Sequence, residues 1–276
     1  MKITIELLDQ EDHVKTGVFS YDKVSKPYRV SGNDLAVLGI KKMAWQVGEK
    51  IRVTTEQPAS YVWVQLDETL APTLVYLADT KWTYTIPAEK CTVDTAFESH
   101  RHYLMVRTAM PAEIGAYQNL ALNPHDQRAT STAYPHVFTN VTDEPDPVFW
   151  PQNAVDGKLA NISHGSYPYG SWGIHEHANA TLTIDFGRVV KLTTVRLLFR
   201  HDHLERVHDG YWDHVTLAFS NGDERTFETD DCADFQTLTF EPQLTDKLIL
   251  KDLHKAPNSA RFVALTQIEA YGYNQL

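Results

Sequence analysis

Hydrophobic and polar residues alternate along much of the chain, whereas helical periodicity is scarce. In the N-terminal part the alternation is found in residues 3–7, 51–55, 61–66, 74–77 and 82–86. A period of two is typical of strands that bury one face. Pro, Gly and Asp turns separate these segments, so the pattern predicts an all-β fold of the sandwich type.

With 276 residues the chain is long for one domain, and two domains fit the usual domain size. We expect a first β-sandwich domain at residues 1–115, closed by a strand near residues 102–108. Residues 110–118 predict a connector with one helical turn. The second domain then comprises residues 116–276.

The second domain has strand patterns of its own. Residues 181–187 alternate and then stop at a glycine. Residues 215–219 lead into Asn221-Gly222, a dipeptide suited to the positive backbone angles of a tight hairpin turn. Residues 225–229 are the expected return strand of that hairpin.

Several segments of this half, taken in order, resemble a discoidin-like domain. They are NLALN (119–123), NAVDG (153–157), WG (172–173), TLTIDFG (181–187), VRLLFR (195–200), VTLAFSNG (215–222) and ALTQIEAYG (264–272). The resemblance covers residues 116–273. It implies a galactose-binding-like jelly roll, as in coagulation-factor C-type domains and bacterial carbohydrate-binding modules, and it implies binding rather than catalysis.

A narrower resemblance rests on residues 134–136, 164–173 and 200–212. These segments are similar to a group of bacterial proteins in which a discoidin-like half follows a β-domain. That resemblance implies no activity.

Charge narrows the choice of partner. The formal net charge is −11, so no basic excess exists to bind nucleic acid or an anionic membrane surface. Charged residues interrupt the first twelve positions, so we expect no secretory signal and a cytoplasmic protein. Cys91 and Cys232 fall in different expected domains and are interpreted as free thiols.

Two groups of residues predict a carbohydrate site at the rim of the second sandwich. The first group is His164, Tyr169, Trp172 and His175, because sugars stack on aromatic rings and offer hydroxyls to polar partners. The alternative is that Tyr169 and Trp172 fill the bottom of the sandwich.

The second group is Arg200, Asp202, His208 and Trp212. Arg200 ends an apolar strand, and an arginine fork held by an aspartate is a common way to orient two hydroxyls. The family resemblance implies that Arg200 contacts the ligand. The alternative is an Arg200–Asp202 pair that only fixes the loop.

The resemblance also implies a structural calcium ion, with Asp156 and Glu269 at the matching positions. The alternative there is an Asp-Gly turn and a solvated glutamate. A different metal hypothesis uses the ligands of a transition metal, although their spacing matches no established motif. These ligands are His201, Asp202, His203, His208 and Asp209.

The function that these observations favour is non-catalytic carbohydrate binding. One alternative is a metal- or His/Asp-dependent enzyme acting on a sugar-type substrate, although G-x-S-x-G, Walker A and G-x-G-x-x-G motifs are absent from the sequence. The other is a structural module whose first domain forms a homo-oligomer or joins a partner chain.

Overall fold

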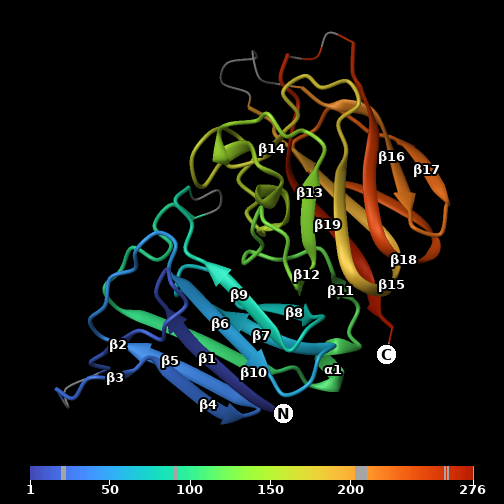
Figure 1. Cartoon of the computed structure of the whole chain (residues 1–276). Coiled ribbons are helices and arrows are strands. Elements are labelled where there is room, and N and C mark those ends of the chain that lie inside the picture. Colours follow the sequence, from blue (N-terminus) through green and yellow to red (C-terminus); the bar gives the residue numbers. More distant parts are fainter. Residues whose placement is uncertain (20–22, 90–92, 203–209, 258, 260, 276) are drawn as a thin grey trace.

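The computed structural model describes the chain except residues 20–22, 90–92, 203–209, 258, 260 and 276. The described residues form two lobes built from strands (Figure 1). The helical elements are short: α1 (Pro111–Ile114), η1 (Pro147–Phe149) and η2 (Pro151–Val155). The predicted all-β fold is confirmed, and α1 is the predicted helical turn of the connector.

The first lobe is a sandwich of two antiparallel sheets. One sheet has the order β4 (Arg29–Asn33), β1 (Lys2–Leu8), β6 (Lys50–Thr55), β9 (Lys81–Thr85). The other has the order β12 (Ala133–Tyr134), β8 (Thr73–Leu77), β7 (Ser60–Gln65), β10 (His102–Thr108), β5 (Leu35–Ile40). A small hairpin joins β2 (Thr16–Gly17) to β3 (Lys26–Pro27). Alternate residues of both sheets fill one core, with Ile5, Val53, Val64 and Leu104 fully buried.

Strand β5 has no counterpart among the predicted strands. Its burial alternates regularly, but the outward residues Leu35 and Val37 are also apolar and are exposed. Polarity therefore does not alternate along β5, and the period of two is hidden. Tyr103 on the paired strand β10 is exposed beside them. This apolar face is compatible with the proposed oligomer, which stays a prediction.

The second lobe contains eight strands around a single core. Six of them follow the order β11 (Gln118–Asn119), β19 (Ala264–Asn274), β15 (Leu182–Phe199), β18 (Gln236–Lys255), β16 (Trp212–Phe219), β17 (Glu224–Glu228). The other two are β13 (His136–Thr139), which pairs with β15, and β14 (Trp172–Gly173), which pairs with β19. Its core is independent of the core of the first lobe. The jelly-roll and calcium details implied by the family resemblance stay predictions.

Two local predictions in this lobe need correction. Gly187 does not end a strand: β15 continues through it, with a register shift between Asp185 and Val190. Gly187 has φ +64°, and a Cβ there would lie 2.4 Å from the Tyr134 ring, so only glycine allows this bend. In the β16–β17 hairpin Gly222 alone takes a positive φ, of +90°, while Asn221 does not.

The chain passes between the lobes more than once. The expected boundary at 115/116 lies between α1 and β11. Strand β12 comes after this boundary in the chain, yet it pairs with β8 of the first lobe.

The buried His125 also contacts the first lobe: its Nε2 accepts a hydrogen bond from the backbone N–H of Leu66, 3.2 Å away. Burial lowers the pKa of His125 to about 3, so the ring stays neutral and can accept.

Arg188 of β15 contacts both lobes at this junction. Its guanidinium lies 5.1 Å from the ring of Tyr61 and 5.0 Å from that of Tyr76, both in the first lobe. Within its own lobe it donates to Asn274 Oδ1 and to the carbonyl oxygen of Phe186. One charged group therefore joins β15 to β7 and β8 through two ring contacts, while its hydrogen bonds fix it within the second lobe.

We expect Arg188→Ala to lower the free energy of unfolding by about 2–4 kcal/mol, because it removes two cation–π contacts and several charged hydrogen bonds. Urea denaturation measures this loss. The control is Arg225→Ala, which removes an exposed pair with Asp223 and should change stability by less than about 1 kcal/mol. Equal effects of the two substitutions would contradict the role of Arg188.

Candidate functional site

A pocket of about 390 Å³ lies at one end of the second lobe, where β14 and β15 end and β19 begins. Three of the residues predicted from the sequence line it: His164, His175 and Arg200. The full lining is Glu144, Asp146, Phe149, His164, Gly173, Ile174, His175, Arg200, Phe262, Val263 and Ala264.

Arg200 directly follows the last residue of β15, so the strand delivers it to this end of the lobe. Its backbone N–H donates to Ala264, and its guanidinium donates to the carbonyl oxygen of Phe262. The side chain lines the pocket but is largely covered, since the residue is only 3% exposed. These contacts pin the start of β19 against the end of β15.

Asp202 makes its shortest described contact with a histidine. Its Oδ2 lies 2.6 Å from Nδ1 of His164, and the carboxylate is buried while the imidazole is about one-third exposed. A buried carboxylate on Nδ1 fixes the orientation and the tautomer of a ring. The structure thus joins two predicted residues in a pair that the sequence did not pair.

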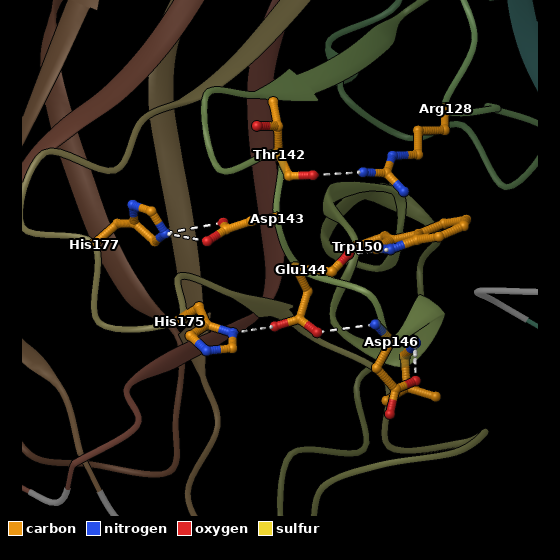
Figure 2. A network of polar contacts seen from close by, with 9 residues as sticks. Arg128, Thr142, Asp143, Glu144, Asp146, Trp150, His175 and His177 are labelled. Carbon is orange, nitrogen blue, oxygen red and sulfur yellow. Dashed lines mark hydrogen bonds and ion pairs between the residues drawn. The ribbon is translucent and has the colours of Figure 1, made fainter.

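An acidic loop, residues 143–146, faces a histidine loop, residues 175–177 (Figure 2). Glu144 Oε2 lies 3.2 Å from Nδ1 of His175, and Asp143 Oδ1 lies 2.9 Å from Nε2 of His177. His175 and Glu176 both have positive φ, of +47° and +60°. This loop therefore turns sharply and presents its two imidazoles to the two carboxylates.

The acidic loop has hydrogen bonds of its own. The N–H of Asp146 donates to Glu144 Oε1, and Asp146 caps η1 by accepting from the N–H of Val148 (Figure 2). Hydrogen bonding from His177 lowers the pKa of Asp143, which keeps this carboxylate ionised. Beside the loop, Arg128 lies over the Trp150 ring at 4.4 Å.

Aromatic rings form the apolar part of the pocket lining. Phe149 ends η1 and Phe262 precedes β19, and both are half-buried. A Cβ on Gly173 would lie 3.1 Å from Phe149 Cβ, so the glycine lets this side chain pack close to β14. Nothing in the sequence pattern singled out these two rings, because they belong to loops rather than to a periodic segment.

The structure gives Trp172 and Trp212 a packing role instead of the predicted ligand contact. They are 1% and 0% exposed, and their ring centroids lie 6.1 Å apart. Phe199 contacts Trp212 edge to face at 5.4 Å. A sugar stacks on an exposed ring face, and these indoles present none. For Trp172 this agrees with the alternative that it fills the bottom of the sandwich.

The remaining predicted ligand residues are Tyr169 and His208. Tyr169 is half-buried, and its side chain is not among those that line the pocket. His208 lies outside the described residues, as do His203 and Asp209 of the transition-metal hypothesis. The other two proposed transition-metal ligands, His201 and Asp202, are described. Nε2 of His201 lies 3.3 Å from Oδ1 of Asp231.

The two predicted calcium ligands have different environments. Asp156 is buried, and its Oδ1 accepts from the N–H of Lys158. The adjacent N–H of Gly157 donates to Gln267, not to Glu269. Glu269 instead forms an ion pair with Arg196 at 2.8 Å. A carboxylate oxygen is a ligand that Ca²⁺ takes, so Asp156 fits the donor set, whereas Glu269 already has a cationic partner.

A second pocket, of about 220 Å³, lies between the lobes. Tyr84 and Phe97 of the first lobe and Gln127, Arg128 and Trp150 of the second are among its lining residues. Gln127 is held there by paired hydrogen bonds to the backbone of Thr85. No sequence pattern predicts this pocket, because it depends on how the lobes pack.

Comparison with known proteins finds no matching family model and no matching curated protein. Some solved structures are similar to part of the chain. One of them is chitosan-binding module 2 of a chitosanase/glucanase from Paenibacillus sp. IK-5, in complex with chitotriose. It is 19% identical to this chain, with a TM-score of 0.39. The match covers 56% of this chain and 100% of that chain.

Two further matches are also sugar-binding domains. The family 32 carbohydrate-binding module of C. perfringens NanJ with galactose has 15% identity and a TM-score of 0.37, covering 49% of this chain and 91% of that one. The lectin domain of lectinolysin with Lewis B antigen has 15% identity and a TM-score of 0.40, covering 57% and 98%. Similarity at these scores does not indicate what this chain binds.

In the described part of the chain no helix is long and apolar enough to cross a membrane.

The pH dependence of stability tests the environment of Asp156. Burial raises the pKa of its carboxyl from 3.8 to about 7. The folded protein therefore holds this proton more tightly than the unfolded chain, and the contribution of Asp156 to stability falls as pH rises from about 4 to about 7 and then levels off. Asp156→Asn removes this dependence, so over that range the variant should gain up to about 4 kcal/mol relative to the wild type.

Urea denaturation of both proteins at pH 4, 5.5, 7 and 8 measures this gain. A stability difference that stays constant from pH 4 to pH 8 would show that Asp156 is not a buried acid.

Proposed function

We propose that this protein binds carbohydrate without catalysis, in the pocket at the end of the second lobe. The observation that carries the proposal is the composition of the lining, in which Phe149 and Phe262 lie among Glu144, His164 and His175. A pyranose offers apolar C–H faces and a ring of hydroxyls, and this lining offers partners for both.

The arrangement of the polar groups supports the same proposal. Glu144 and Asp202 each hold a histidine at hydrogen-bonding distance, so both imidazoles are oriented before any ligand arrives. Planar groups that are fixed in advance lose little entropy when they bind hydroxyls. Arg200 adds a guanidinium whose position is set by Phe262.

One observation favours a second candidate function, a His/Asp-dependent enzyme. The His164–Asp202 pair, at 2.6 Å in a pocket that also contains Glu144 and Asp146, has the composition of a general base and its orienting acid. Release of product from a bound glycan would favour this function, and binding without turnover would favour the first.

Calcium is proposed as a structural ion and not as part of the pocket. Asp156 would be the carboxylate ligand, with backbone oxygens of its turn as the other ligands. The oxygen of Gln267 takes the place proposed for Glu269, because it is the side chain that contacts the turn.

We expect His175→Ala to weaken the binding of a sugar selected on a glycan array by at least about tenfold, or about 1.4 kcal/mol. His175 is well exposed, and its loss removes one wall of the pocket without disturbing the core. Isothermal titration of the wild type and the variant measures the change.

The matched control is His177→Ala in the same loop. His177 also pairs with a carboxylate, but it does not line the pocket. Its substitution should leave the affinity within about twofold of wild type. An array on which no glycan is retained, or equal losses in the two variants, would contradict the proposal.

A further inference from the structure

Two histidines and an aspartate converge on the β16–β18 pair of strands, in a part of the second lobe that does not line the proposed sugar pocket. Oδ1 of Asp213 lies 2.8 Å from Nδ1 of His214 and 2.5 Å from Nδ1 of His254. All three side chains are partly or largely exposed, so solvent reaches them.

Irregular strand pairing creates this convergence. Neighbouring residues of a regular strand point to opposite faces, so Asp213 and His214 would normally be separated. Here Trp212 pairs with Lys255 and His214 with His254, which leaves Asp213 as an extra residue in β16. Such a bulge redirects side chains, and it brings Asp213 to the same side as His214.

Strand β18 has a compensating irregularity. His254 pairs with His214 but Lys251 pairs with Thr216, so β18 has one residue more than β16 in this interval. Asp252, within the interval, has φ +49°, an uncommon conformation for a residue other than glycine. The strained backbone sets His254 opposite His214 and near Asp213.

We propose that Asp213, His214 and His254 bind a divalent transition metal ion, with Zn²⁺ as the occupant and one coordination position open to solvent. Two imidazole nitrogens and one carboxylate oxygen are ligands that Zn²⁺ takes, whereas Ca²⁺ and Mg²⁺ prefer oxygen alone. Around a tetrahedral Zn²⁺ the ligand atoms lie about 3.3 Å apart. The described distances are slightly shorter, so small side-chain rotations would open the cluster to the ion.

The surroundings of the cluster support an ion there. Glu228 on β17 lies 3.8 Å from Nε2 of His214, the nitrogen that does not face Asp213. At 3.8 Å Glu228 makes no hydrogen bond to the ring, but its carboxylate adds negative charge beside the cluster, which favours a cation there.

Two other groups of described residues have ligand atoms equally close together, but each offers a single imidazole. One of them, Asp9, Glu11 and His13, is also exposed and lies in the first lobe. It provides a matched control, because a non-specific attraction of Zn²⁺ to histidine beside carboxylate would act there as well.

The test is isothermal titration of the full chain with ZnCl₂ at pH 7.5, comparing wild type, His254→Ala and His13→Ala. We expect one saturable site in the wild type, at least about tenfold weaker binding in His254→Ala and no change in His13→Ala. His254 is 67% exposed, so the variant should keep its fold, and an unchanged melting temperature verifies this.

Histidine-detected ¹⁵N NMR gives a second measurement. Zn²⁺ should shift the Nδ1 signals of His214 and His254 before those of any other histidine. The proposal is overturned if the wild type shows no saturable binding, if His254→Ala and His13→Ala bind alike, or if other histidines shift first.

Discussion

The end of the second lobe depends on one buried aromatic cluster, formed by Trp172, Phe199 and Trp212. Each ring belongs to the first or last residue of a strand, and the chain beyond Trp172 and Phe199 contributes residues to the pocket lining. Trp172 is followed by the loop that contains His175, and Phe199 by Arg200. Burying two indoles and a phenyl ring is worth several kcal/mol, so the rings anchor the strand ends from which the pocket is built.

This dependence explains which parts of the site could be predicted from the sequence. The strand that ends at Phe199 was predicted from its apolar run, and Arg200 was therefore placed at a rim. The tryptophans were assigned to the ligand because sequence gives residue type and not burial. His175 and Glu144 lie in two different loops and are 31 positions apart in the sequence. A local sequence pattern therefore cannot predict their contact.

The same reasoning applies to the fold. Strands with one apolar face, such as β1 and β10, were predicted from alternation. Strand β5 was not, because Leu35 and Val37 are apolar on its solvent face. Two features depend on packing between distant segments: the return of the chain to the first lobe at β12, and the contact of Arg188 with the rings of Tyr61 and Tyr76.

The most direct test of carbohydrate binding is a titration of the isotope-labelled protein with its best glycan-array ligand, followed by TROSY NMR of the backbone amides. The account predicts that the largest shifts fall on Gly173, Ile174, Arg200 and Val263, all of which line the pocket at the end of the second lobe. Shifts concentrated instead on Tyr84 and Gln127 would place the ligand between the lobes and contradict the account.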